Sequence, residues 1–557
     1  MRLSSSCALN LALAALLTGV ALAGNVFGPR TVALSGSPAA DVGGAVFANF
    51  QAPVIATGGR VAFGATLALG GGVTTANDQG IWAYSDATLG QLQVREGDAV
   101  PGAPAGQTFK TFYRAHFGRG GTFAVHADTN AFLDGVWTHR FGALGALALE
   151  GAAAPGLPGV QWNISSATRT QMRDDGVVYF DPVLSGAGVN DTNNLSIFAA
   201  APGGGATLIA RRGERAIGLA EEFTFNIFDL RDRTQPRAAF KASIRGPGVD
   251  TTNDEGIWAH GPLGLRLVVR EGAQADGMPL GAQFQVLATH AFTPSTTNAA
   301  RTAFIARAVG GGLTEANDTG IWAESGFGLE LVAREGNAAP GGPAGATFGD
   351  FQGAENRLPR WVGFGRLAFV HTMVGGGVTA FNDEGIWVGD KGGVSLVARE
   401  GDPAPGAAPG QVFIRNDAFQ FLPVLNEAGQ VAFWTRLTGQ GITSANDFGI
   451  WATDPDGALR LIAREGDPLE VAPGDVRIVS SLALAADPSS GLVLGTSFSG
   501  AGDLTFRATF TDGSLGVFVT RVPEAASAAL LAFAGLTLRC TRRSATVGGQ
   551  RGGPKRG

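Results

Sequence analysis

One short string, centred on Gly-Ile-Trp, recurs along the 557 residues of this chain. Five clear copies place tryptophan at the same point, and three weaker copies place Trp or Phe there. These marker aromatics are Trp82, Trp137, Phe198, Trp258, Trp322, Trp387, Trp451 and Phe518. Regular self-similarity is a strong constraint, because every unit must fold alike and pack on its neighbours. Eight copies spaced by 55 to 67 residues predict eight like units.

The residues around each marker aromatic predict short strands joined by tight turns. In the seventh unit, strands are expected near residues 413–425, 430–439, 449–454 and 458–465. Apolar and polar residues alternate within them, which is the period of a strand, and the body shows no sustained helical period. The turn sequences Asn-Glu-Ala-Gly and Asp-Pro-Asp-Gly lie between strands, where glycine and Asx residues tolerate turn dihedrals. Each unit is therefore predicted to hold four antiparallel strands.

Eight four-stranded units predict an all-β fold, an eight-bladed β-propeller. Residues 30–41 resemble the strand that follows a marker aromatic, but no marker precedes them. Residues 513–521 contain the last marker, and no such strand follows. The N-terminal strand is thus expected to complete the last blade, which removes both open sheet edges. A seven-bladed propeller and an open β-solenoid are the alternatives.

In such a blade, the loop before the marker strand shares a face with the link to the next blade. Five aspartates are expected to ring this face: Asp78, Asp254, Asp318, Asp383 and Asp447. Six glutamates of the link are expected nearby: Glu96, Glu150, Glu271, Glu335, Glu400 and Glu465. Five arginines precede them: Arg95, Arg270, Arg334, Arg399 and Arg464.

This acidic face has two interpretations. In the structural one, Asn and Asp close Asx turns before the glycine, and each arginine pairs with an acid between blades. In the other, the five aspartates contribute oxygen ligands to calcium, although the Asp-x-Asp-x-Asp-Gly spacing does not occur. The repeated tryptophan is expected in the core between sheets and not as a platform for sugars.

No catalytic motif is evident, and no cofactor other than calcium is suggested. His139 and His260 share one register, two residues after the marker, with Tyr84, Glu324, Gly389 and Thr453. His116 and His126 lie together in one atypical unit. Since a unique site should break the repeat symmetry, we expect any such site within residues 110–240. The chain is accordingly not expected to be an enzyme.

Both ends of the chain have the character of targeting segments. Residues 1–23 combine Arg2, an apolar stretch and a small-x-small ending, which predicts a signal peptide cleaved between Ala23 and Gly24. The predicted propeller occupies residues 24–521. Residues 522–557 contain a short motif, an uncharged segment at 525–538 and an arginine cluster. The motif is Val522, Pro523 and Glu524, and the cluster is Arg539, Arg542 and Arg543.

This C-terminal layout resembles the PEP-CTERM sorting signal of exported bacterial proteins, which has Pro-Glu-Pro, an apolar transmembrane helix and a basic end. Here Ala525 replaces the second proline, and a further tail runs to residue 557. The resemblance implies recognition by an exosortase-type enzyme and a place at the cell surface. Separately, Asn426 to Phe433 resembles a bacterial tandem-repeat family with an NxxGxxAF pattern, from which no activity follows.

Charge and cysteine usage restrict the possible partners and sites. Residues 24–538 contain 34 basic and 47 acidic residues, a net charge of −13, which disfavours nucleic acid as a partner. Both cysteines, Cys7 and Cys540, lie outside this body. We expect a non-catalytic binding or structural module of the cell surface or extracellular matrix, with polysaccharide or surface proteins as partners. A secreted glycan-active enzyme or lectin and a calcium-binding surface protein are the alternatives.

Overall fold

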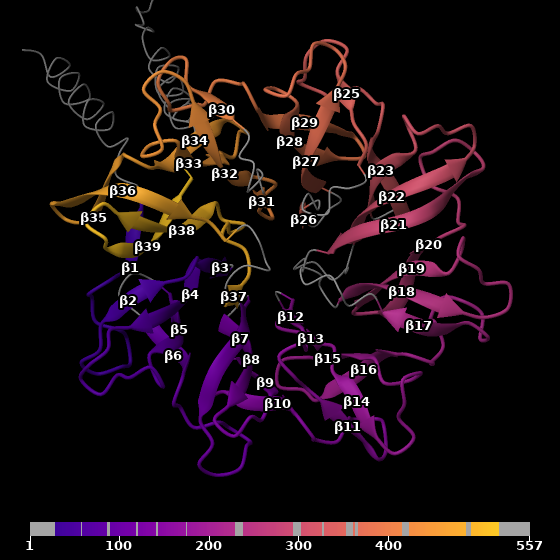
Figure 1. Ribbon diagram of the computed structural model, residues 1–557, viewed down its shortest axis with the longest axis horizontal. Coiled ribbons are helices and arrows are strands. Elements are labelled where there is room, and N and C mark those ends of the chain that lie inside the picture. Colours follow the sequence, from indigo (N-terminus) through magenta and orange to yellow (C-terminus); the bar gives the residue numbers. More distant parts are fainter. Residues whose placement is uncertain are drawn as a thin grey trace, which may run out of the picture.

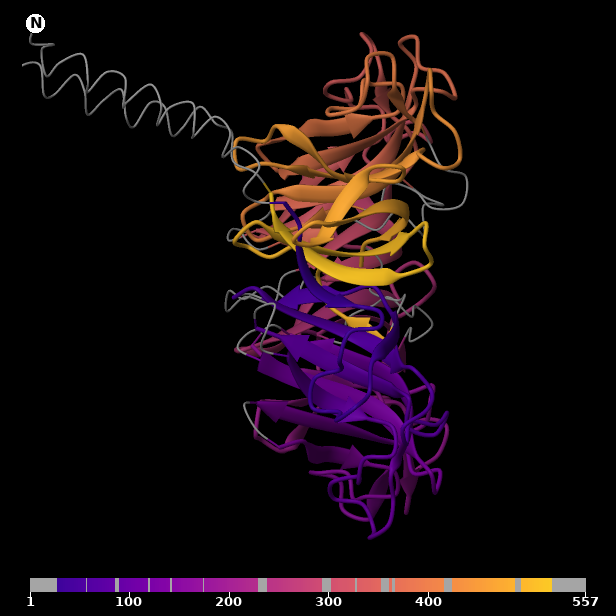
Figure 2. The same cartoon turned by 90° about the vertical axis from the view of Figure 1, so that its left-hand side faces the viewer.

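The computed structural model describes thirteen stretches of the chain. These are residues 28–56, 58–85, 90–118, 121–140, 143–173, 175–228, 238–292, 302–325, 328–351, 360–362, 366–414, 423–485 and 492–522. The regular elements of these residues are 39 β-strands, grouped into eight blades around a common axis (Figure 1). Seen from the side, the ring of blades is a flattened body (Figure 2). The predicted eight-bladed propeller is confirmed, and the seven-bladed and solenoid alternatives are wrong.

The first four blades follow the order of the marker aromatics. Blade 1 contains β2 (Phe47–Phe50), β3 (Val54–Ala56), β4 (Arg60–Leu67), β5 (Gln79–Tyr84) and β6 (Gly90–Arg95). Blade 2 contains β7 (Phe109–Phe117), β8 (Thr122–Thr129), β9 (Gly135–Arg140) and β10 (Gly145–Leu149). Blade 3 contains β11 (Val160–Asn163), β12 (Thr170–Met172), β13 (Val178–Phe180), β14 (Val183–Gly186), β15 (Ser196–Ala200) and β16 (Ala206–Arg211). Blade 4 contains β17 (Thr224–Phe228), β18 (Ala239–Arg245), β19 (Glu255–Gly261) and β20 (Gly264–Arg270).

The other four blades repeat the same antiparallel order. Blade 5 contains β21 (Ala282–Phe292), β22 (Thr302–Gly310), β23 (Thr319–Ser325) and β24 (Gly328–Arg334). Blade 6 contains β25 (Thr347–Phe348), β26 (Arg360–Val362), β27 (Arg366–Val374), β28 (Glu384–Asp390) and β29 (Gly393–Arg399). Blade 7 contains β30 (Val412–Ile414), β31 (Val424–Leu425), β32 (Val431–Thr438), β33 (Phe448–Thr453) and β34 (Leu459–Arg464). Blade 8 contains β35 (Pro468–Ala472), β36 (Asp475–Ala483), β38 (Asp503–Phe510), β39 (Leu515–Arg521) and β1 (Arg30–Leu34).

The marker tryptophans form the core of their blades, as predicted. All six are fully buried, and each ring meets a phenylalanine of the blade's first strand edge-on at about 5 Å, as Phe284 meets Trp322. The glycine two residues earlier is required by this packing. A Cβ on Gly256, for example, would lie 2.8 Å from the ring of Trp258. The Gly-Ile-Trp string is therefore a packing motif.

Each indole also fixes the connection between two blades. Its Nε1 donates to a main-chain carbonyl of the link that enters its own blade, as Trp322 does to Asp276 at 2.8 Å and Trp451 to Pro405 at 3.0 Å. The other four bonds measure 2.8 to 2.9 Å and join Trp82 to Ala40, Trp137 to Pro101, Trp258 to Ile217 and Trp387 to Pro340. The marker tryptophan therefore packs in the core of its blade and also fixes the link that comes from the preceding blade.

The ring closes where the sequence predicts. Strand β1 pairs antiparallel with β39, with Arg30 opposite Val519 and Leu34 opposite Gly516. The pairing continues past the strand, where Ser35 and Leu515 exchange two hydrogen bonds of 2.8 and 2.9 Å. The two ends of the described chain thus share one sheet, at the left of the ring in Figure 1. No blade is left with a missing fourth strand.

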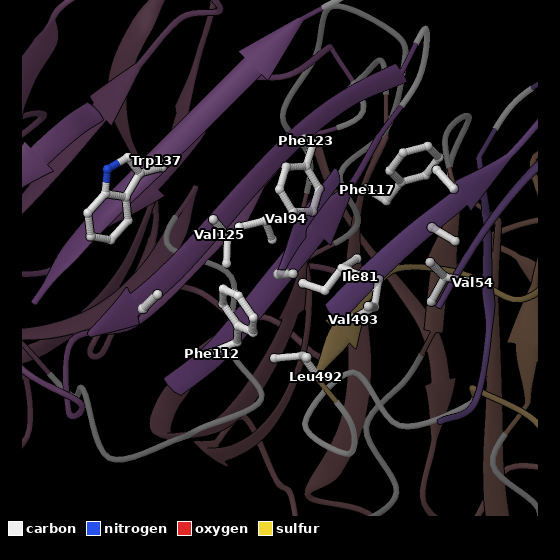
Figure 3. Packing of buried hydrophobic residues seen from close by; sticks show 14 of the residues in the cluster. Val54, Ile81, Val94, Phe112, Phe117, Phe123, Val125, Trp137, Leu492 and Val493 are labelled. Carbon is white, nitrogen blue, oxygen red and sulfur yellow. The ribbon is translucent and has the colours of Figure 1, made fainter. Parts of the chain in front are cut away.

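A second connection, which was not predicted, joins blade 8 to blade 2. Strand β37 (Val493–Leu494) leaves blade 8 and runs parallel to β7, with Val493 opposite Ala115. On the way it passes blade 1, where the Leu492 N–H donates to the Gln51 side chain at 2.6 Å. Leu492 and Val493 lie against Val54 and other core residues of blades 1 and 2 (Figure 3). The C-terminal part of the chain therefore bridges three consecutive blades.

Candidate functional site

The loop before each marker strand is fastened by its asparagine. In six blades the side-chain oxygen accepts the main-chain N–H three residues earlier, as Asn446 does from Thr443 at 2.7 Å. The other five asparagines are Asn77, Asn193, Asn253, Asn317 and Asn382. The Asn446 amide also donates to the Gly441 carbonyl at 3.1 Å. The predicted Asx turn toward the glycine is wrong, since this asparagine bonds back into its loop.

The repeated arginines also form hydrogen bonds to the loop. In five blades the arginine Nε donates to the main-chain carbonyl of that asparagine, as Arg464 does to Asn446 at 2.8 Å. The same bond, of 2.6 to 2.8 Å, joins Arg95, Arg211, Arg270 and Arg334 to their asparagines. Arg399 instead pairs with Asp402 of its own link at 2.6 Å. The prediction that these arginines pair with acids between blades is therefore wrong for Arg95, Arg270, Arg334 and Arg464, and it holds for Arg399, whose partner lies on the link between blades 6 and 7.

The repeated glutamates lie beneath the same loops. Glu96 and Glu271 accept main-chain N–H groups at the start of the marker strand of their own blade, from Gln79 at 3.3 Å and Glu255 at 3.1 Å. Burial, which disfavours the charged form, raises the pKa of Glu96, Glu271 and Glu465 to about 7. Neighbouring acids add to the shift, among them the aspartate of the loop in each case. Loop aspartate and link glutamate are thus neighbours in these blades.

These pKa shifts predict that folding stability falls as pH rises. A carboxyl group whose pKa is raised on folding stabilises the protein most below its unfolded pKa, and that stability is lost as pH rises through about 7. We expect the triple variant E96Q/E271Q/E465Q to melt several degrees higher than the parent at pH 8 and alike at pH 5. Each site contributes about 1 kcal/mol after allowance for solvent screening. Thermal melting at both pH values measures the effect.

Three exposed glutamates provide a matched control. The variant E221Q/E222Q/E315Q removes the same number of charges from exposed positions. It should change the melting temperature equally little at pH 5 and pH 8. Equal behaviour of the two triple variants would contradict the buried-carboxyl explanation.

The five aspartates proposed as calcium ligands occupy equivalent places, one to a blade. Asp318 accepts a hydrogen bond from Arg307 Nε at 2.8 Å, and Asp447 lies 3.5 Å from Arg436. Asp78, Asp254 and Asp383 are half-buried at the same point of their loops. Among the described residues, no group of three or more His, Cys, Asp or Glu side chains is placed to hold a metal ion. Each aspartate therefore lies in the loop of its own blade, apart from the other four.

The register two residues after the marker contributes to packing between blades and within them. His260 Nδ1 lies 3.1 Å from the Tyr179 hydroxyl of blade 3, and Glu324 accepts from Arg266 of blade 4 at 3.0 Å. Thr453 accepts the Val431 N–H at 2.8 Å, and the His139 ring packs on Phe123. Burial lowers the pKa of both histidines, so both are neutral at pH 7. At this register His260 and Glu324 therefore join neighbouring blades, whereas Thr453 and His139 pack within their own blade.

Blade 2 breaks the repeat, as predicted for residues 110–240. Its loop between β8 and β9 is a short turn without the fastening asparagine. Beside this turn lie Tyr113 of β7, His126 and Asp128 of β8, and Asp134. We call these four residues the blade-2 cluster. The sequence singled out His126 but missed the other three, although the shortened loop with an acid before Gly135 could have indicated them.

The blade-2 cluster contains polar atoms without partners. His126 is fully buried, and neither ring nitrogen forms a hydrogen bond of normal geometry. Its Nε2 lies 3.9 Å from Asp134 Oδ1, and its ring centroid lies 4.9 Å from that of Tyr113. The Tyr113 hydroxyl bonds with Asp128 and Asp134, although the buried Oδ1 atoms of both aspartates form no hydrogen bond of normal geometry. Each such atom costs about 1–3 kcal/mol unless another group satisfies it.

The protonation states of this cluster follow from its burial. Desolvation, with Arg114 and His116 nearby, lowers the pKa of His126 to about 3, so the ring is neutral at pH 7. Desolvation and then the Asp128 and Glu150 charges raise the pKa of Asp134 to about 6. Desolvation and then the two aspartates raise the pKa of Tyr113 to about 12. A neutral imidazole and a phenol thus lie beside two carboxyl groups.

The predicted terminal signals lie almost wholly outside the described residues. This applies to Ala23, Gly24, Pro523, Glu524 and the arginine cluster 539–543. Val522 belongs to the folded body, since it is buried and donates its N–H to the Gly502 carbonyl at 2.9 Å. Within the part of the chain that the structure describes, no helix has the length and apolar character to cross a membrane. The apolar segment 525–538 lies beyond that part.

The fold and its loops define the chain as an eight-bladed β-propeller. The chain belongs to the family of unknown function DUF7453, whose model matches residues 22–133, 129–360 and 354–529. No curated protein sequence matches it.

Solved structures that resemble the chain are propellers of low sequence identity. The β-propeller domain of the Trilobed protease from Pyrococcus furiosus is 9% identical, with a TM-score of 0.32, over 76% of this chain and 100% of that one. The periplasmic gluconolactonase of Pseudomonas aeruginosa is 11% identical, with a TM-score of 0.24, over 86% and 97%. The fucose-specific lectin from Aleuria aurantia is 9% identical, with a TM-score of 0.22, over 63% and 94%. At such values, the functions of these proteins have no bearing on this chain.

Proposed function

We propose that this protein is an exported, non-catalytic binding module of the cell surface or extracellular matrix, with a polysaccharide or a surface protein as its partner. The observation that supports this most is the rigid loop face. In six blades an asparagine and in five an arginine bond to main-chain groups of the loop, as Asn77 and Arg95 do in blade 1. A preorganised surface binds with little loss of conformational entropy.

Export is part of the same proposal and rests on the two ends of the chain. The N-terminal 23 residues have the character of a signal peptide, and the C-terminal segment has the layout of a sorting signal. We propose an exosortase-type enzyme as the processing partner. Mass spectrometry of the protein recovered from cells tests this, with an N-terminus at Gly24 and a missing C-terminal tail as the expected result. An intact Met1 in the recovered protein would contradict export.

Binding is tested with the full chain. Extracellular polysaccharide from the producing cells, immobilised on beads, is expected to retain the folded protein and to release it on competition with soluble polysaccharide. The same protein after heat denaturation is the control, because its loop face is lost. If folded and denatured protein are retained equally, the binding is unspecific and the proposal fails.

A glycan-active enzyme is the second candidate, and the two acids of the blade-2 cluster favour it. Asp134, with its pKa raised to about 6, lies beside Asp128, and glycosidases use a pair of carboxyl groups in which the general acid has a raised pKa. An assay for new reducing ends on the retained polysaccharide decides between the candidates. Release of reducing ends that D134N abolishes would replace the non-catalytic proposal.

A further inference from the structure

We infer that the side chain of Phe27 docks into a cavity beside β1 once the predicted signal peptide has been removed. The inference rests on the proposed export, because Phe27 is the fourth residue of the chain that cleavage before Gly24 leaves. It goes beyond the proposed function by giving the new N-terminal segment a binding site on its own fold.

The cavity lies where the closing strand β1 meets blade 1, and we call it the β1 cavity (Figure 1). Its volume is about 430 Å³, which is within the range of ordinary ligand pockets. Strand β1 contributes residues 31–34 to its walls, and the link after β1 contributes residues 37–40. Tyr84 and Gly90 of blade 1 and Val471 of β35 complete the lining.

Two departures from the repeat explain why a cavity opens here, and the first is Asp41 in the link. The link into blade 1 has Asp41 directly after Ala40, with a backbone φ of 61°, and its carboxylate accepts the Leu92 N–H at 2.9 Å. Because Asp41 carries a Cβ, this link cannot approach its blade as closely as the others. Five other links have a glycine at this point, where a Cβ would lie 2.6 to 2.8 Å from a side chain of the blade they enter: Gly102, Gly218, Gly277, Gly341 and Gly406.

The second departure is Gly90, which lies opposite Tyr84 on the neighbouring strand. A Cβ on Gly90 would lie 2.4 Å from the Tyr84 ring and 2.8 Å from its hydroxyl, so glycine is required to leave room for the phenol. Gly90 therefore covers this end of the cavity with no side chain of its own. Blades 4 to 7 have an apolar side chain at the equivalent point, namely Leu265, Leu329, Val394 and Leu459.

The lining of the β1 cavity favours a neutral, apolar occupant. The hydroxyl groups of Thr31 and Ser37 already donate to main-chain carbonyls, at 2.7 and 2.5 Å. Val32 and Ala39 contribute buried apolar surface. Burial and a nearby carboxylate raise the pKa of Tyr84, so its phenol is neutral at pH 7. Aliphatic walls beside one aromatic ring suit a second aromatic ring.

Phe27 is close enough in the chain to supply that ring. Between the predicted cleavage site and β1, Val26 and Phe27 are the residues with large aliphatic or aromatic side chains. A chain advances at most about 3.6 Å per residue, so Phe27 lies within about 14 Å of Thr31 in the cavity wall. Gly28 and Pro29 follow directly, and a Gly-Pro pair is typical of a turn, which allows the segment to fold back along β1. Before cleavage, the same segment continues into the apolar stretch of the signal peptide.

The test uses the chain that begins at Gly24, produced with 3-fluorotyrosine in place of tyrosine. The sequence has three tyrosines, so the fluorine NMR spectrum should contain three signals, and Y84F identifies the signal of Tyr84. We expect F27A to shift this signal and to leave the other two in place. The polar neighbour Asn25 gives the matched control N25A, whose spectrum should equal that of the parent.

Toluene, which corresponds to the side chain of phenylalanine, provides a second measurement. It should bind F27A at least about tenfold more tightly than the parent, because docked Phe27 competes for the cavity only in the parent. Bound toluene should also return the Tyr84 signal of F27A toward its position in the parent. Phe27 precedes every strand of the ring, so F27A should keep the fold, which circular dichroism verifies.

Other outcomes overturn the inference. An unmoved Tyr84 signal in F27A, or equal toluene affinity in F27A and the parent, would show that Phe27 does not occupy the cavity. A shift of the same size in N25A would mean that the segment acts without its aromatic ring. The tested chain begins at Gly24 by design, so its result does not depend on export. An uncleaved N-terminus in the recovered protein would remove the export proposal, whereas failed docking would leave that proposal intact.

Discussion

A chain shortened to begin at Gly36 is expected to melt about 5–10 °C below one that begins at Gly28. The shorter chain lacks β1, which pairs with β39 along four residue pairs and buries Val32 and Ala33 against blade 1. Loss of this burial and of the ladder hydrogen bonds costs several kcal/mol, about 5 in total. Differential scanning calorimetry of both chains measures the difference.

The unpaired β39 gives this prediction a second observable. A free strand edge pairs readily with another chain, so the shortened protein should associate as its concentration rises. The chain that begins at Gly28 is the matched control, because it keeps β1 and should remain at one size. Equal melting temperatures and equal sizes would show that the last blade is stable with its remaining strands and that ring closure adds nothing.

Replacing the marker tryptophan of blade 5 is expected to cost about 3–5 kcal/mol for Trp322→Ala. The ring is fully buried between Phe284 and Phe304, with centroids 5.0 and 6.1 Å away, so its removal leaves a large cavity. Trp322→Phe keeps an aromatic ring but leaves the Asp276 carbonyl without its donor, at a cost of about 1–3 kcal/mol. Denaturant unfolding, followed by the remaining tryptophans, measures both variants.

Two comparisons make the tryptophan result interpretable. Phe381→Ala removes an exposed aromatic ring and should change the free energy of unfolding by less than about 0.5 kcal/mol. Blades 3 and 8 carry Phe198 and Phe518 at the marker position, which shows that the position accepts phenylalanine where the surroundings are adapted to it. If Trp322→Phe were as stable as the parent, the bond from the indole to the link would contribute nothing to stability.

Most of the fold could be predicted because the same pattern recurs in every unit. A strand assigned in one unit is therefore supported by its counterparts in the others. The eight marker aromatics and the unmatched strands at 30–34 and 515–521 were enough to give blade number and closure. The crossing of β37 to blade 2 could not be predicted, because a two-residue parallel strand has no periodic pattern. Its hydrogen bonds, such as Ala115 N–H to the Leu492 carbonyl, join residues that no local motif connects.

Prediction of the candidate site was less complete for a physical reason. Residue type and spacing placed the Asn-Asp loop and the Arg-Glu link side by side, but they could not tell a side-chain partner from a main-chain one. Arg464 illustrates the difference, since it bonds to the carbonyl of Asn446 and not to an acid of a neighbouring blade. The departure of one unit from the repeat was more informative about the site, because His126 was identified only from its place in that atypical unit.

The closing strand pair also constrains when the protein can become folded. Ser35 and Leu515 form hydrogen bonds where β1 meets β39, a junction we call the seam. These two residues are 480 positions apart in the chain. Contacts of such sequence separation form late, and their loop-closure entropy slows folding. A ribosome must therefore release nearly the whole polypeptide before the seam can form. The nascent chain therefore lacks its final strand pair throughout synthesis and can reach its closed form only after translation is almost complete.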